Sequence, residues 1–86
     1  MNNNLSNKVV YIKDEAMLEE AREMLEKYNQ PITNDGTFSL SPDSQQRYLQ
    51  RYLIGKSFWL GEKHYTETEI TLIELEQLLK QNRDAR

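Results

Sequence analysis

Apolar residues recur at helical spacing between residues 14 and 29, and the positions between them are mostly charged. Asp14 can cap the first turn of a helix here, while Asn29 and Pro31 can end it. The pattern predicts an amphipathic helix with its glutamates in solvent, and an acidic docking surface is the alternative use of those glutamates. The apolar stripe consists of Met17, Leu18, Ala21, Met24, Leu25 and Tyr28. We expect its methionines to fill the core, because no apolar residue is left over for a partner.

A shorter apolar run, Val9 to Ile12, precedes this helix. Its four consecutive β-prone residues predict a strand covered on both faces, in the interior of a small sheet. The residues before it are polar and rich in asparagine. We therefore expect residues 1–7 to form a disordered leader and order to begin at Lys8.

The C-terminal part of the chain carries a specific helix-start signal. Thr71 and Glu74 have the spacing of a capping box, and Ile70 and Leu75 have the spacing of its hydrophobic staple. The pattern predicts a helix whose apolar face excludes Ile73. That face consists of Leu72, Leu75, Leu78 and Leu79.

A second box, Thr66 with Glu69, would start this helix earlier. Residues 65–72 alternate between polar and apolar side chains and are rich in threonine, so a strand is favoured there.

The middle of the chain holds the best-marked helix signals. Ser41, Pro42 and Asp43 suit the start of a helix, and Gly55 suits its end, which predicts a helix over residues 42–54. The core side of this helix would carry Tyr48, Leu49, Tyr52 and Leu53. The outward side would carry Arg47, Gln50, Arg51 and Ile54.

Two β-rich runs then flank Gly61 and Glu62. A Gly-X pair between such runs predicts a hairpin with a primed turn, in which Gly61 takes a positive φ. Alternation puts Phe58 and Leu60 on one face of the first strand and Trp59 on the other.

Asn34-Asp35-Gly36 predicts a turn that either joins a short hairpin or leads into a single strand at residues 37–40. The resulting order is β-α-β-α-β-β-α. We predict a single α+β domain over residues 8–83, with three helices packed on a small mixed sheet and a frayed tail at residues 84–86. Right-handed crossovers would make the strands on either side of a helix parallel.

The chain has 86 residues and no cysteine, which predicts one domain without disulfides and favours the cytoplasm. No apolar run is long enough to span a bilayer. The net charge of −3 is unevenly spread. Residues 14–29 carry six acidic against two basic residues, or −4, whereas residues 41–65 carry four basic against two acidic residues, or +2. This asymmetry can orient a protein partner or a second copy of the chain as a homodimer.

No motif for catalysis or cofactor binding stands out. The three glycines lie far apart, which excludes the common nucleotide-binding loops. The single histidine, His64, has no nucleophile motif to serve, and without cysteine a metal would depend on carboxylates that lack convergent spacing. We therefore predict no enzyme activity, no cofactor and no metal site.

The residue types favour a protein-binding or regulatory module. Arginine, tryptophan and tyrosine often anchor interfaces, and here they cluster in the central stretch. The predicted partner-binding residues are Arg47, Gln50, Arg51, Ile54, Trp59, Lys63, His64 and Tyr65. Small size and a lack of chemistry fit an accessory protein, such as a regulator, an inhibitor, an immunity-type protein or a product of a phage or other mobile element.

A small DNA-binding regulator is the alternative. The same helix, followed by a basic hairpin with Lys63 and His64, has the order of a recognition helix and a wing. The negative net charge argues against DNA, because nucleic-acid-binding domains are usually strongly basic.

Overall fold

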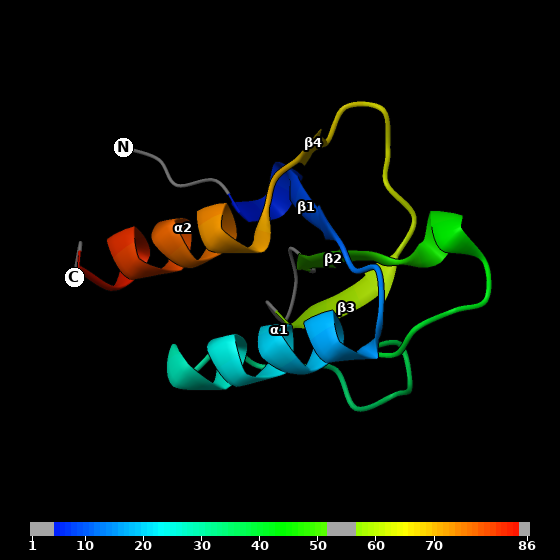
Figure 1. The fold of residues 1–86 in the computed structure, drawn as a ribbon. Helices are drawn as coiled ribbons and strands as arrows, with labels where there is room; N and C mark the ends of the chain where they lie inside the picture. The colour runs from blue at the N-terminus through cyan, green and yellow to red at the C-terminus, as the bar shows by residue number, and fades with distance from the viewer. Residues whose placement is uncertain (1–4, 52–56, 85–86) are drawn as a thin grey trace.

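The computed structural model describes residues 5–51 and 57–84, which form a four-stranded mixed sheet and two helices (Figure 1). The α+β class is confirmed, but the expected third helix is wrong. In chain order the elements are the 3-10 turn η1 (Leu5–Asn7), strand β1 (Lys8–Tyr11), helix α1 (Glu15–Lys27), the 3-10 turn η2 (Ser44–Gln46), strands β2 (Tyr48–Arg51), β3 (Phe58–Gly61) and β4 (Thr68–Glu69), and helix α2 (Leu72–Asp84).

Strand β1 lies in the interior of the sheet, as the sequence predicted. The strand order is β3-β2-β1-β4. Strand β1 is parallel to β4 but antiparallel to β2, whereas we expected the strands on either side of α1 to be parallel. Val9 and Val10 point to opposite faces, and both are buried. The rest of the domain therefore covers both edges and both faces of β1.

The core lies between one face of the sheet and the two helices. The register places Leu49 opposite Val10 on one side and Leu60 on the other, so these three side chains share a face. The core cluster of buried residues comprises Leu5, Val10, Ile12, Leu18, Ala21, Met24, Leu25, Tyr28, Phe38, Leu49, Phe58, Leu60, Leu75 and Leu79. The residues that alternate with Val10, Leu49 and Leu60 along the strands lie on the other face of the sheet.

Helix α1 begins and ends where its local signals indicate. The Asp14 carboxylate accepts a hydrogen bond from the Met17 N–H at 2.9 Å, which caps the first turn. At the other end Asn29 adopts the left-handed conformation with φ 59°, and the N–H groups of Asn29 and Gln30 close the last turn. The predicted apolar stripe faces the core, so this helix is confirmed.

Helix α2 begins with the predicted capping box. The Thr71 N–H donates to the Glu74 carboxylate at 2.8 Å, and the Glu74 N–H donates to the Thr71 hydroxyl at 3.1 Å. The strand expected over residues 65–72 shrinks to the two residues of β4. The alternative box does not form, because Thr68 and Glu69 pair with β1 instead.

The helix predicted over residues 42–54 is wrong. Asp43 does cap a turn, since its carboxylate accepts from the Gln45 N–H at 2.9 Å, but only the single turn η2 follows. Strand β2 then begins at Tyr48 and pairs with both β1 and β3. A cap favours only the first turn, whereas a position between two strands satisfies the backbone along its length. Residues 52–54 lie outside the described residues.

The turn predicted at Gly61 and Glu62 is also wrong. Gly61 is the last residue of β3, which pairs antiparallel with the preceding strand β2 rather than with a later one. The chain then runs through a loop of residues 62–67 to β4 at the opposite edge of the sheet. The antiparallel pair is therefore formed by β2 and β3, whereas the sequence predicted a hairpin between β3 and the residues after Gly61.

The loop after α1 covers the outer edge of β3. The Phe58 N–H donates to the Pro31 carbonyl at 2.9 Å, and the Leu60 N–H donates to the Thr37 carbonyl at 3.0 Å. Residues 37–40, expected as a strand, are part of this loop. An unpaired edge would expose backbone groups, so the loop protects the sheet from pairing with another chain.

The predicted turn at Asn34-Asp35-Gly36 is confirmed. The Asp35 carboxylate accepts hydrogen bonds from the Thr37 hydroxyl at 2.8 Å and from the Thr37 N–H at 3.1 Å. These bonds to Thr37 lower the pKa of Asp35 below its ordinary value. Gly36 has φ 94°, a conformation that favours glycine.

The N-terminal segment joins the core before Lys8. Residues Leu5–Asn7, expected in the disordered leader, form η1, and Leu5 is only 3% exposed. Burial of one leucine side chain is enough to attach such a short segment. Residues 1–4 lie outside the described residues, as do residues 85–86 of the expected tail, and Asp84 is the last residue of α2.

We expect Thr71→Ala to lower the free energy of unfolding by about 1 kcal/mol, because the Glu74 N–H loses its capping hydroxyl. The matched control is Thr66→Ala, which removes a threonine from the box that does not form and should change stability by less than about 0.5 kcal/mol. Urea unfolding followed by circular dichroism measures both. Equal losses for the two variants would contradict the assigned start of α2.

Candidate functional site

The residues that the sequence suggested for docking do not share one surface. Alternation along β2 places Gln50 and Arg51 on opposite faces of the sheet. Ile54 lies outside the described residues. The remaining residues are Arg47 before β2, Trp59 in β3, and Lys63, His64 and Tyr65 in the loop after β3. The single helix face that would have united the first four does not form.

Arg47 forms hydrogen bonds to backbone carbonyls in two separate segments of the chain. Its Nε donates to the Ser41 carbonyl at 2.7 Å, and its Nη1 donates to the Lys13 carbonyl at 3.0 Å. The Arg47 carbonyl in turn accepts from the Ile12 N–H at 2.9 Å. Arg47 thus ties the loop before η2 to the segment that leads into α1. Its guanidinium is committed to these carbonyls rather than presented to a partner.

Gln50 and Trp59 lie opposite each other on the sheet face that points away from the helices. Gln50 is 7% exposed, and its Nε2 donates to the Glu62 carbonyl at 2.8 Å. The Trp59 ring lies over Gly61, where an added Cβ would come within 2.1 Å of the ring. Gly61 is therefore needed for a close contact and not for a positive φ. Gln50 and Trp59 stabilise the sheet on this face.

The other suggested residues have separate surroundings. Arg51 is partly buried at the end of β2, and this burial lowers the pKa of its guanidinium. The Lys63 ammonium donates to the neighbouring His64 carbonyl at 3.3 Å, and the His64 N–H donates to the Glu67 carboxylate at 2.7 Å. Tyr65 projects from this loop and is 94% exposed.

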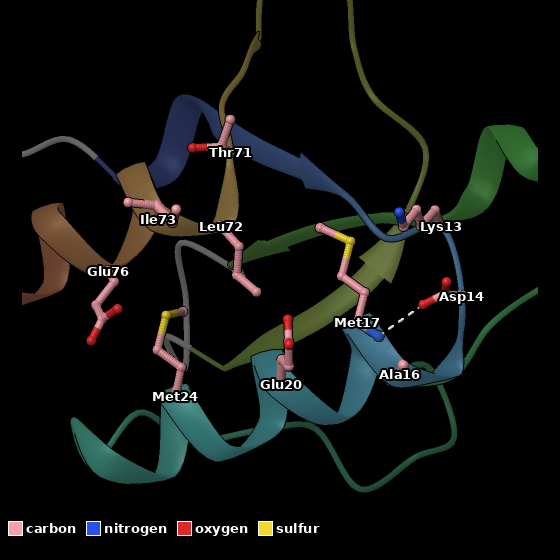
Figure 2. A pocket seen from close by; sticks show the side chains of 10 residues that line it. All are labelled: Lys13, Asp14, Ala16, Met17, Glu20, Met24, Thr71, Leu72, Ile73 and Glu76. Carbon is pink, nitrogen blue, oxygen red and sulfur yellow. Dashed lines mark hydrogen bonds between the residues drawn. The ribbon is translucent and has the colours of Figure 1, made fainter.

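A groove of about 680 Å³ lies between α1 and the first turns of α2 (Figure 2). Met17 and Met24 point toward it from α1, and Leu72 points toward it from α2. Ile73 lies at its margin and is 72% exposed. The complete lining is Lys13, Asp14, Ala16, Met17, Glu20, Met24, Thr71, Leu72, Ile73 and Glu76. The groove thus has an apolar floor and charged walls.

Polar contacts at one end of the groove join the two helices. The Glu76 carboxylate of α2 accepts from the Tyr28 hydroxyl at 3.1 Å and from the Lys27 ammonium at 3.4 Å. Lys27 lies four residues after Glu23 on α1, but its ion pair is with Glu76 across the helices. These contacts join the helices at the end of the groove next to Met24.

The apolar stripe of α1 is wider than the core that it covers. Ala21 and Leu25 are fully buried at its centre, but Met17 at its edge is only half-buried. The methionines contribute to the core as expected, since Met24 is buried within it and Met17 packs against it, but both also line the groove. One sequence signal did point here, since Ile73 falls outside the leucine face of α2.

The charged walls of the groove are mostly acidic. The carboxylates of Asp14, Glu20 and Glu76 oppose the single ammonium of Lys13, which gives the lining a net charge of −2. Asp14 already caps α1, and Glu76 already binds Tyr28 and Lys27. Glu20, between the two methionines, has no hydrogen-bond or ion-pair partner among the described residues.

In the described part of the chain, no three histidine, cysteine or acidic side chains are grouped so that they could hold a metal ion. Neither helix described is long and apolar enough to cross a membrane. Searches of protein-family models, curated proteins and solved structures found no significant match to this chain.

We expect Arg47→Gln to lower the free energy of unfolding by about 1–3 kcal/mol, because two backbone carbonyls lose a charged donor. The matched control is Lys63→Gln, which removes the same charge from a side chain bonded only to its neighbour and should cost less than about 0.5 kcal/mol. Chemical denaturation tests this. Equal stability of the two variants would show that Arg47 is an exposed residue after all.

We expect Gly61→Ala to destabilise the domain by about 1–3 kcal/mol, because the new methyl group must displace the Trp59 ring. In a Trp59→Ala background the same change should cost little, since the obstacle is gone. A double-mutant cycle measures this coupling, and tryptophan fluorescence reports the displaced ring. Additive effects of the two changes would show that the contact does not exist.

Proposed function

We propose that this domain is a non-catalytic protein-binding module whose docking surface is the groove between α1 and α2. The observation that carries the proposal is the apolar floor formed by the buried Met24 and the partly buried Met17 and Leu72, beside the exposed side chain of Ile73. Apolar grooves between charged walls are common docking sites for segments of other proteins. Methionine suits such a floor, because its flexible side chain adapts to the shape of a partner.

Protein binding is the type of function that the residue composition indicated, but the proposed docking surface is a different one. The sequence placed docking on a central helix and hairpin, but Arg47 and Gln50 are engaged within the fold. The DNA alternative needs the same helix as its recognition element, and residues 42–51 do not form it. An accessory, inhibitor or immunity-type role fits a small docking module. The absence of cysteine supports a cytoplasmic site of action.

The test uses peptides selected from a random display library on the purified domain. We expect Ile73→Glu to weaken their binding by about tenfold or more, because a carboxylate would stand at the margin of the apolar floor. Tyr65→Glu is the matched control: Tyr65 is the other large apolar side chain that is exposed in the described part of the chain, and it belongs to the surface first suggested by sequence. It should leave binding unchanged. Fluorescence anisotropy gives the affinities, and thermal melting verifies that both variants fold.

Three results would overturn the proposal. One is full retention of peptide binding by Ile73→Glu, and the second is its loss in Tyr65→Glu. The third is retardation of a DNA duplex at physiological salt by a domain that selects no groove-binding peptide.

A further inference from the structure

We infer that the segment bound in this groove is a basic amphipathic helix of a partner protein. The inference rests on the proposed function and adds the conformation and charge of the occupant. Three properties of the groove support it: its walls offer no strand edge, its lining is acidic, and its methionines are spaced by two helical turns.

The absence of a strand edge in the lining favours a helical occupant. All lining residues belong to α1, to α2 or to the residues just before them. The backbone groups inside these helices are already paired, so they cannot bind the backbone of an extended peptide. A strand laid over Met17 and Leu72 would leave its own N–H and C=O groups unsatisfied against apolar side chains. A helix satisfies these groups internally and presents only side chains.

The charge of the groove favours a basic occupant. Glu20 projects between Met17 and Met24 without a partner among the described residues, and the lining as a whole carries a net charge of −2. A lysine or arginine beside the apolar stripe of the incoming helix can pair with Glu20. Its aliphatic stem can cover the methionines at the same time. An acidic helix would instead place like charges together, which is unfavourable.

The spacing of the floor residues fits a helix. Met17 and Met24 lie seven residues apart on α1, which corresponds to about 10 Å along its axis. Apolar residues at i and i+7 of a docked helix have the same separation, with a residue at i+3 or i+4 between them to meet Leu72. The α1 helix of a second copy fits poorly, because its exposed face is rich in glutamate.

The experiment uses three fluorescein-labelled peptides of about 18 residues, long enough to form an isolated helix. The first carries a leucine stripe on a lysine background, the second has glutamate for every lysine, and the third is a scrambled version of the first without a stripe. Anisotropy titrations give the affinities for the folded domain. Amide shifts in NMR spectra of the 15N-labelled domain show whether each peptide binds at the groove.

We expect the basic helical peptide to bind about tenfold or more tightly than either comparison peptide, and to shift the amides of the groove residues. Glu20→Lys should weaken this binding by about three- to tenfold, and added salt should weaken it further. The matched control is Glu26→Lys, which makes the same charge change on an exposed part of the same helix outside the groove. It should alter the affinity by less than about twofold.

The outcomes separate this inference from the proposed function. If the acidic or scrambled peptide binds the groove as tightly as the basic one, or if Glu20→Lys and Glu26→Lys have equal effects, the inference is wrong while docking at the groove stands. If none of the three peptides shifts the groove amides and the display-selected peptides are insensitive to Ile73→Glu, the inference and the proposed function are both wrong.

Discussion

The burial of β1 is the constraint on which the rest of the structure depends. Its two central valines face opposite sides of the sheet, and both are removed from water. A strand buried in this way needs hydrogen-bonding neighbours along both edges, because its backbone groups cannot reach solvent. Here β2 supplies one edge and β4 the other, in opposite orientations. The sheet is therefore mixed, because β1 has an antiparallel neighbour on one edge and a parallel neighbour on the other.

The same arrangement explains why the two helices meet only in part. Only two residues connect β4, at the edge of the sheet, to helix α2, so the position of α2 is set by the pairing of β4 with β1. Helix α1 follows β1 and packs on the same core through its apolar stripe. Glu76 joins the helices through Tyr28 and Lys27. The groove lies beside this contact, between α1 and the start of α2.

Local signals in the sequence predicted the elements that depend on neighbouring residues. The cap at Asp14, the closure at Asn29 and the box of Thr71 with Glu74 each involve residues a few positions apart, and each forms as expected. The β1 strand was equally clear, because four β-prone residues in a row leave no polar face. These features fix both helices and the central strand before any tertiary contact is known.

The central stretch could not be predicted in the same way, because its local signals conflict with its tertiary contacts. Ser41 to Asp43 start a turn, while Tyr48 and Leu49 fit a helix or a strand equally well. Pairing with β1 and β3 decides for the strand, and those partners are distant or follow later in the chain. Gly61 was misassigned for a related reason. Its role comes from the Trp59 ring that lies over it, which a turn pattern does not reveal.

The groove escaped prediction because it depends on the separation of two helices that lie about fifty residues apart in sequence. An apolar stripe indicates which face of a helix is turned inward, but not how much of that face the core will use. In α1 the core covers the centre of the stripe at Ala21 and Leu25 and leaves Met17 half-buried. In α2 it leaves Ile73 in solvent. A small domain gains stability from each apolar side chain that it buries. Two such side chains left beside one groove, with the Glu20 carboxylate unpaired among the described residues, are therefore the features on which the proposed docking surface is based.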